Sequence, residues 1–251
     1  MNIFTILAFI ATIASFLPIA VVLYQRLGTY KSFPAVIAYF IPVFLYNLMV
    51  DEYIHVNENV ILATGFANNL LNAPLMLLFL SYFSTSSLFA KRLRWFTVIY
   101  ILFEIVMVVV FGFNFSTITI ILGPGLFVVF SLIVYLFYKH SKVVVRNKKA
   151  LGKCFMLGGL LFGFGLYVIL YLLIYITKSQ EVKYTMFLYN LNLTISTIAL
   201  CIGIVYERKR IDRLMEVKLV RKELNEINKH EKRVIRVSNT PLLDFDRELW
   251  N

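Results

Sequence analysis

The sequence is poor in charged residues and in cysteine, and both shortages restrict the classes of protein to which it can belong. Only 16% of its 251 residues are charged, while 60% are hydrophobic. A soluble domain usually carries about a quarter charged residues, so a water-exposed surface over most of the chain is excluded. The two cysteines, Cys154 and Cys201, both lie in apolar segments. A framework of structural disulfides is therefore not expected.

The motifs of several enzyme and cofactor classes are also missing. The three histidines, His55, His140 and His230, lie far apart in the sequence and form no clustered ligand set for a metal or haem. There is no GxSxG nucleophile motif, no Walker or glycine-rich phosphate loop, and no pair of aspartates as in prenyl transferases. We therefore predict that the chain is not an enzyme and carries no cofactor.

Long hydrophobic runs dominate what is present, and the mean hydropathy is +0.77. A helix needs about 20 mostly apolar residues to cross a hydrocarbon core of ~30 Å. Seven segments qualify: 3-25, 33-50, 60-83, 95-113, 117-138, 154-177 and 185-206. Because backbone groups in the bilayer must be satisfied within their own segment, these runs predict an all-α, polytopic bundle. We expect a transmembrane domain, 1-206, followed by a basic cytoplasmic helical tail, 207-251.

The basic residues predict the orientation in the membrane. With the N-terminus outside, 23 of the 25 lysines and arginines fall on the cytoplasmic side, and only Lys178 and Lys183 fall outside. The positive-inside rule favours this arrangement, in a cell (inner or plasma) membrane. If segment 60-83 did not span, six helices with an internal N-terminus would place 21 basic residues inside and four outside. Both arrangements put the tail in the cytoplasm, and the net charge of +11 then reflects topology and not nucleic-acid binding.

The predicted topology resembles that of the microbial rhodopsins, which also have seven helices and an external N-terminus. In that family retinal is attached to a lysine in the middle of the seventh helix, but segment 185-206 contains no lysine. Retinal is therefore excluded. The run from His230 to Arg233 faintly resembles the phospho-acceptor box of histidine kinases. However, Pro241 comes later than that family's proline, and the tail leaves no room for an ATP-binding domain, which argues against kinase activity in this chain.

Polar residues inside the predicted spans occur from the bilayer centre outward and predict a ligand pocket in the outer half of the bundle. The three asparagines of segment 60-83 lie on one helical face, and tyrosines recur every fourth residue in segment 154-177. We expect Glu104, the only carboxyl group in the apolar core, at the pocket floor. The alternative is that the amides only hold helices together. The candidate residues are Asn47, Asn68, Asn69, Asn72, Glu104, Tyr167, Tyr171, Tyr175, Asn190 and Asn192.

The seventh helix is predicted to continue into the cytoplasm. Neither glycine nor proline occurs from Glu207 to Asn239, which is 33 residues, or ~50 Å as a helix. Apolar residues in this stretch follow a spacing of three and four and predict a seam for a homodimer or for a cytoplasmic signalling partner. The alternative is a solvated basic helix near anionic lipid. The candidate partner-binding residues are Val217, Val220, Leu224, Ile227 and Val234.

These features together predict a bacterial-type seven-transmembrane sensor or receptor. It would bind a small or lipid-like ligand and signal through the helix continuous with the seventh span to a separate partner. The alternatives are a small-molecule or proton-coupled transporter or channel subunit that uses Glu104, and a membrane anchor or assembly subunit. A membrane enzyme has the least support. Gly159 and Gly163 fit the small-xxx-small spacing, which predicts close packing inside the bundle, with a dimer face as the alternative.

Overall fold

All regular secondary structure in the described part of the chain is helical. The computed structural model describes residues 3–84, 86–147, 150–176 and 182–230, with their side chains except at 147, 175–176, 182–184 and 225–230. Within these residues, seven helices are long and apolar enough to cross a membrane. The chain is therefore a multi-pass membrane protein with an all-α fold, as predicted. The helices are α1 (Ile3–Tyr24), α2 (Phe33–Val50), α3 (Glu58–Leu80), α4 (Ser87–Phe111), α5 (Phe115–Asn147), α6 (Leu151–Tyr171) and α7 (Val182–His230), with a 3-10 turn η1 (Ser81–Phe83) after α3 and a π turn η2 (Leu172–Ile176) after α6.

The polar third segment forms a complete span despite the asparagines in its middle. Together α3 and η1 give a continuous apolar helix, Glu58–Phe83. The Asn57 side chain accepts a hydrogen bond from the backbone N–H of Asn59 at 3.2 Å and so caps the start of the helix. Inside the helix each backbone amide is satisfied locally, so the asparagine side chains need only find partners among neighbouring helices. The prediction of seven spans is confirmed over the six-span alternative.

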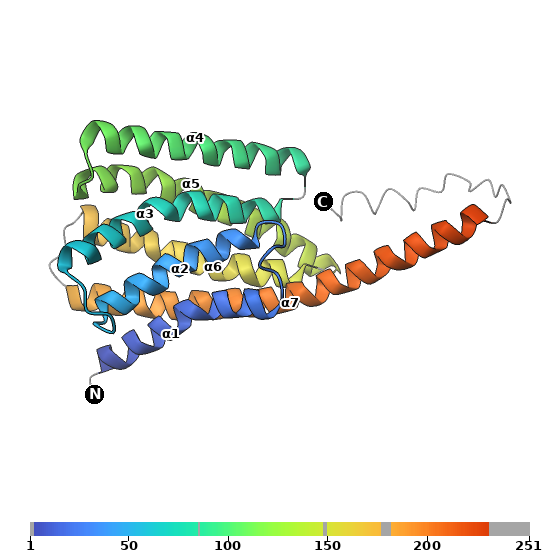
Figure 1. Cartoon of the computed structure of the whole chain (residues 1–251), viewed down its shortest axis with the longest axis horizontal. Coiled ribbons are helices and arrows are strands. Elements are labelled where there is room, and N and C mark those ends of the chain that lie inside the picture. Colours follow the sequence, from blue (N-terminus) through green and yellow to red (C-terminus); the bar gives the residue numbers. More distant parts are fainter. Residues whose placement is uncertain (1–2, 85, 148–149, 177–181, 231–251) are drawn as a thin grey trace.

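Six of the spanning helices form a ring, and α4 lies outside it. Around the ring, neighbours follow the order α1, α2, α3, α5, α6 and α7, and α7 closes the ring against α1. α4 packs against α3 and α5 from outside and lies at the edge of the molecule (Figure 1). It buries a smaller share of its apolar length than any other spanning helix. The ring therefore has an interior to which α4 does not contribute.

Glycines bring α6 and α7 together, and this pair packs more extensively than any other. A Cβ added at Gly159 would lie 2.9 Å from the Ser196 backbone oxygen, and one added at Gly203 would lie 2.5 Å from the Met156 backbone nitrogen. Only glycine permits this approach. Gly163 also faces Ser196, so the small-xxx-small face packs inside the bundle, as predicted. The dimer-face alternative does not fit, because α7 already covers this face.

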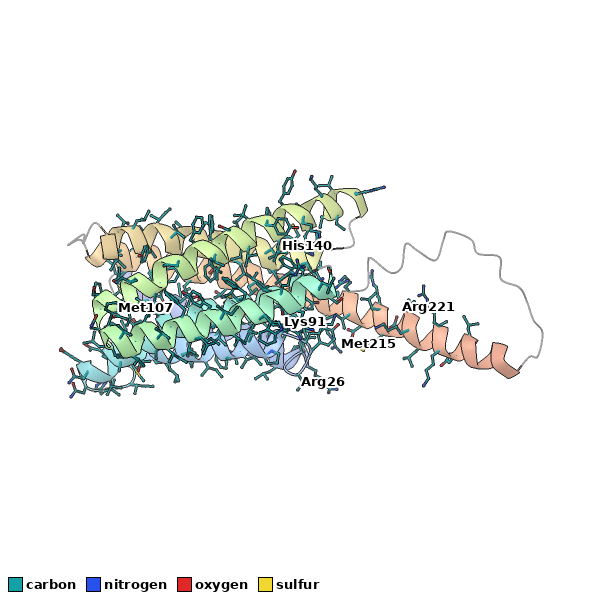
Figure 2. The ribbon with its side chains drawn as sticks, turned by 90° about the horizontal axis from the view of Figure 1, so that it is seen from above. Arg26, Lys91, Met107, His140, Met215 and Arg221 are labelled. Atoms are coloured by element: carbon teal, nitrogen blue, oxygen red, sulfur yellow. The ribbon has the colours of Figure 1, made fainter. Side chains whose placement is uncertain are left out.

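The bundle has a basic end, which we define as the end from which α7 leaves it. Arg26, Lys91 and His140 lie near this end, whereas Met107 lies toward the opposite end (Figure 2). The end also holds the linker between α1 and α2 and the linker between α3 and α4. The structure thus gathers the basic segments on one side, as the sequence analysis requires. The side of the membrane that this end faces stays a prediction.

Two helices reach farther into the basic end than predicted. α4 begins at Ser87 instead of residue 95, so Lys91 and Arg94 lie in its first two turns. α5 continues to Asn147 instead of residue 138. It carries His140 into the packed interior, where the side chain is only 4% exposed. The predictions ended these helices at the first charged residues, although basic side chains at a membrane surface are compatible with helix.

α7 is continuous and passes out of the bundle (Figure 1). The predicted continuation of the seventh helix is observed as far as His230, while the remainder of the tail, including Val234, lies outside the described residues. Ile211 is 2% exposed, so packing continues five residues past the predicted domain boundary at 206. That boundary stays a prediction.

The predicted partner seam lies on the free part of α7. Val217, Val220 and Leu224 are 42%, 53% and 52% exposed, so the described part of the seam is not packed against the bundle. The side chain of Ile227 lies outside the described residues. A partner role for this row stays a prediction.

Candidate functional site

A cavity of about 80 Å³ lies inside the ring, between α2, α3, α6 and α7. Its polar lining includes Asn68, Asn72, Tyr167 and Asn192, which belong to the predicted site, and the remaining walls are largely apolar or aromatic. Along α3 the cavity extends from Asn68 to Met76, so it lies at mid-depth of the bundle. The lining therefore combines a few polar groups with an apolar wall, as ligand sites in helical bundles do.

Two buried amide oxygens, on residues that line this cavity, have no hydrogen-bond partner among the described residues. They are Oδ1 of Asn72 and Oδ1 of Asn192, whose side chains are 5% and 7% exposed. Nδ2 of Asn192 donates to the Gly163 backbone oxygen at 2.9 Å, which fixes the orientation of this amide. Its Oδ1 is therefore the acceptor left over. Burying an unpaired acceptor costs about 1–3 kcal/mol, so both oxygens favour a hydrogen-bond donor in the cavity.

Several other predicted residues are engaged in holding helices together. The Tyr167 hydroxyl donates to Oδ1 of Asn69 at 2.8 Å and links α6 to α3. The Tyr171 hydroxyl donates to the Thr119 backbone oxygen at 3.0 Å and links α6 to α5. Neither Asn69 nor Tyr171 lines the cavity. For these residues the structural alternative, interhelical hydrogen bonding, describes the observed contacts.

The remaining predicted amides also lie away from the cavity lining. Asn47 is buried in α2, where its Oδ1 accepts a hydrogen bond from the Tyr189 hydroxyl at 3.4 Å, while its Nδ2 is unpaired. Tyr189 itself lines the cavity, so Asn47 lies just behind the wall. Asn190 is half-buried on α7. Tyr175 lies in η2, and its side chain lies outside the described residues.

Glu104 does not line the cavity, although we expected it at the pocket floor. It is 7% exposed and lies with Thr97 and Tyr100 on the face of α4 that packs against α3 and α5. The Tyr100 hydroxyl donates to the Ile121 backbone oxygen at 2.8 Å, which fixes this face to α5. α4 lies outside the ring, and neither Thr97, Tyr100 nor Glu104 lines the central cavity. Oε1 of Glu104 has no hydrogen-bond partner among the described residues.

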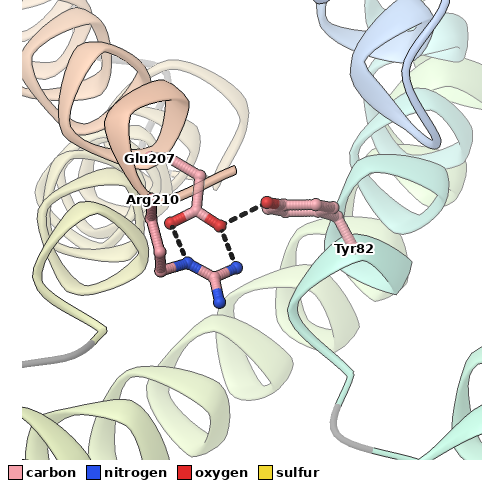
Figure 3. A network of polar contacts seen from close by, with 3 residues as sticks. All are labelled: Tyr82, Glu207 and Arg210. Carbon is pink, nitrogen blue, oxygen red and sulfur yellow. Dashed lines mark hydrogen bonds and ion pairs between the residues drawn. The ribbon is translucent and has the colours of Figure 1, made fainter. Parts of the chain in front are cut away.

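A buried polar network at the basic end joins α7 to η1 (Figure 3). Glu207 is fully buried. One of its carboxylate oxygens accepts the Tyr82 hydroxyl, and the carboxylate pairs with the Arg210 guanidinium, with Nε of Arg210 3.0 Å from Oε2. Nζ of Lys153, from α6, lies 4.9 Å from the centre of the Tyr82 ring. The network connects three elements at the point where α7 leaves the bundle.

Sequence reasoning missed this network because Glu207 was assigned to the solvated tail. Two features of the sequence were available to find it. Glu207 and Arg210 are spaced i and i+3, which places them as neighbours on one helical face. The second feature is Gly152, because a glycine at the start of a span indicates that another helix can pass closely there. In the structure that helix is α7: a Cβ at Gly152 would lie 2.6 Å from the Glu207 backbone nitrogen.

No protein-family model, curated protein or solved structure matches this chain. The function is therefore argued from the geometry alone.

Proposed function

We propose that the protein is a seven-helix membrane sensor that binds a small amphipathic ligand in the central cavity and transmits a helix rearrangement along α7 to a separate partner. The observation that carries this proposal is the pair of unpartnered amide oxygens on Asn72 and Asn192. The two residues come from α3 and α7, and both line the central cavity. A ligand that donates hydrogen bonds to both would hold these two helices in one arrangement.

The cavity restricts the chemistry of the ligand. Its volume, about 80 Å³, is well below the ~300–1,000 Å³ of sites for drug-sized molecules. Met76, Leu160 and Phe164 provide apolar walls. We expect a small molecule with one or two O–H or N–H donors on a compact apolar body, or the polar end of a lipid-like chain.

Transmission depends on the ligand preferring one helix arrangement over another, because only differential affinity shifts a conformational equilibrium. α7 is placed for this role, since it contributes Asn192 to the cavity and continues beyond the bundle. At Gly159 and Gly203 the contact between α6 and α7 is made by glycines, so no bulky side chain at these positions interlocks the two helices. Sliding of α7 against α6 is therefore the motion we propose.

The pocket is tested by small molecules that co-purify with the full chain in mild detergent. Organic extracts of the wild type, Asn72→Leu, Asn192→Leu and Thr194→Val are compared by mass spectrometry. Thr194 is the matched control, because it lies on α7, does not line the cavity, and its hydroxyl donates to the Asn190 backbone oxygen at 2.8 Å. We expect a species that is retained by the wild type and by Thr194→Val and depleted about tenfold in both cavity variants, as for loss of one good hydrogen bond.

Asn72→Leu also separates ligand loss from misfolding. It removes an unpartnered buried oxygen, so the stability of the ligand-free protein should not fall. Extracts that do not differ among the four proteins, with the variants folded, would overturn the pocket.

Movement of the tail is measured with spin labels at Arg92→Cys and Arg221→Cys in a chain whose Cys154 and Cys201 are changed to alanine. Addition of the co-purifying molecule that is depleted in Asn72→Leu should change the distance between the two labels when the cavity residues are those of the wild type. It should leave that distance unchanged in Asn72→Leu. A bound ligand that produces no distance change would contradict sensing through α7 while leaving the binding site intact.

Proton-coupled transport is a second candidate, and the observation that favours it is Glu104. Its carboxyl group is buried within a span and Oε1 is unpartnered, which is costly in a membrane and typical of functional acids. The prediction is proton or substrate flux in liposomes that disappears in Glu104→Gln. Equal flux in Glu104→Gln and the wild type, or no flux in either, would contradict it.

A further inference from the structure

A second cavity, of about 520 Å³, opens at the basic end and is separate from the central one. Its lining comes from the α1–α2 linker, η1, the α3–α4 linker and the start of α4. Three basic side chains, Lys31, Lys91 and Arg94, line it, and among the described residues no acidic one does. Lys91 is seen at this end in Figure 2. We call this second cavity the basic cavity.

Serine hydroxyls hold the walls of the basic cavity in place. Ser32, after α1, and Ser81, in η1, share a hydrogen bond of 2.9 Å, and the Ser81 hydroxyl also lies 2.7 Å from the Leu78 backbone oxygen. The Ser84 hydroxyl donates to the Ser86 backbone oxygen at 2.6 Å. These bonds connect the two linkers, so the cavity is part of the fold and not a gap between unconnected loops.

The positive charge of the basic cavity is not neutralised within the described part of the chain. The ion pairs found there are Arg208 with Asp212 and Arg210 with Glu207, so no carboxylate pairs with Lys31, Lys91 or Arg94. Glu207, the acid of the buried polar network at this end, already pairs with Arg210. Three uncompensated cations around one cavity favour an anion.

The start of α4 adds to this preference. α4 has 25 residues, and its N-cap side chain, Ser86, makes no capping hydrogen bond. The first intrahelical hydrogen bond of α4 runs from the Ala90 N–H to the Ser86 backbone oxygen at 3.1 Å. The backbone N–H groups that precede Ala90 in α4 are therefore open to an anion, and the helix dipole places partial positive charge there. Ser87 and Ala90, in the first turn of α4, line the cavity.

Lys31 is held in an unfavourable state that an anion would relieve. Partial burial, followed by repulsion from Arg210 and Lys218, lowers the pKa of Lys31 from its usual value. A bound negative charge would oppose both effects on the ammonium group.

We propose that the basic cavity binds a phosphate group, carried by an anionic lipid headgroup or by a soluble phosphate compound. Arginine and lysine are the side chains that bind phosphate oxygens in proteins, arginine in a bidentate manner. Basic pockets between transmembrane helices are a known form of lipid-headgroup site. The inference does not depend on the central cavity or on sensing.

The depth of the basic cavity is that of a membrane surface. Arg94 precedes Trp95, whose side chain is 62% exposed on the outer face of α4. Exposed tryptophans in membrane proteins concentrate at the headgroup level. A phosphate at this level is within reach from the bilayer and from water, so the two sources must be separated by experiment.

The test uses the purified full chain in a zwitterionic detergent, so that no charged membrane surface contributes. Short-chain phosphatidylglycerol and short-chain phosphatidylcholine are titrated and followed by native mass spectrometry, and inorganic phosphate is titrated and followed by phosphorus NMR. The cavity variant is Lys31→Gln/Lys91→Gln/Arg94→Gln. The matched control loses the same charge at exposed positions outside the cavity: Arg26→Gln/Arg92→Gln/Arg146→Gln.

We expect the wild type and the control to bind a phosphate ligand and the cavity variant to bind it at least about tenfold more weakly, as for loss of charged hydrogen bonds. Binding of phosphatidylglycerol without competition from inorganic phosphate identifies a lipid source. Binding of inorganic phosphate alone identifies a soluble source. Absence of binding to either ligand, or equal weakening in the two triple variants, would overturn the proposal, because net charge alone would then account for the result.

Discussion

Replacing Arg210 by glutamine tests the buried network at the basic end. The Glu207 carboxylate is fully buried and relies on Arg210 and Tyr82. Removing one partner of a buried ion pair costs about 3–5 kcal/mol, because the remaining charge is left uncompensated. The Arg210 side chain is 28% exposed, so water reaches this edge of the network and the lower end of that range applies. We expect Arg210→Gln to lower the free energy of unfolding by about 3 kcal/mol.

The double variant Glu207→Gln/Arg210→Gln separates the pair from its surroundings. It leaves no carboxylate in the buried site, so its loss of stability should be clearly smaller than the sum of the two single losses. Tyr82→Phe, which removes one hydrogen bond to a charged group, should cost about 1.5–3 kcal/mol. Lys209→Gln is the matched control, since it removes a neighbouring exposed positive charge and should stay within about 0.5 kcal/mol of the wild type.

The assay is unfolding in mixed micelles of mild detergent and sodium dodecyl sulfate, followed by the helical signal in circular dichroism. The reasoning is refuted if Arg210→Gln and Lys209→Gln destabilise equally. It is also refuted if the effects of Glu207→Gln and Arg210→Gln simply add, because the two side chains would then not interact in the folded protein.

Two further predictions concern packing and topology. Gly203→Ala should lower the free energy of unfolding by about 1–3 kcal/mol, because its methyl group would lie 2.5 Å from the Met156 backbone nitrogen. Gly158→Ala should be near neutral in the same assay, since its nearest neighbour is the Phe137 ring at 3.5 Å, and equal losses would contradict the close α6–α7 contact. Reporter fusions to the tail should show activity of a cytoplasmic reporter and none of an exported one; the reverse pattern would invert the proposed orientation.

The number of spans was predictable because hydrophobic length is a local property of the chain. Each run long enough to cross a bilayer became one helix, including the third, with its asparagines. The position of α4 outside the ring was not predictable, because it depends on which faces of the helices meet. Glu104 shows the consequence: its depth in the membrane was readable from the sequence, but its separation from the cavity followed from the ring.

The candidate site was predictable in part. Asn72 and Asn192 are both predicted among the inward polar residues; both line the cavity, and each has an unpartnered amide oxygen. Asn69 shares their character, but the Tyr167 hydroxyl bonds it. Which amide is satisfied depends on the side chain that the neighbouring helix presents, and that information lies in the packing and not in the spacing.

α7 connects the central cavity with the buried network around Glu207, and this connection sets how strongly the ligand of the proposed sensor must prefer one arrangement of α7. From Asn192 in the cavity to Glu207 in the network, the helix rises ~22 Å. A shift of α7 relative to η1 must break the contact between Tyr82 and Glu207, which is worth about 1.5–3 kcal/mol. The ligand must therefore prefer the shifted arrangement by roughly 10- to 100-fold to drive the change.

Tyr82→Phe removes that contact without altering the lining of the central cavity. In the spin-label measurement, this variant should reach the ligand-bound distance at a ligand concentration roughly 10- to 100-fold lower than the wild type, or adopt it without ligand. Tyr30→Phe is the matched control, since Tyr30 packs edge-on against Tyr82, with ring centres 6.4 Å apart, whereas the tyrosine hydroxyl that bonds Glu207 is that of Tyr82. An unchanged concentration dependence in Tyr82→Phe would mean that the motion of α7 does not pass through this network.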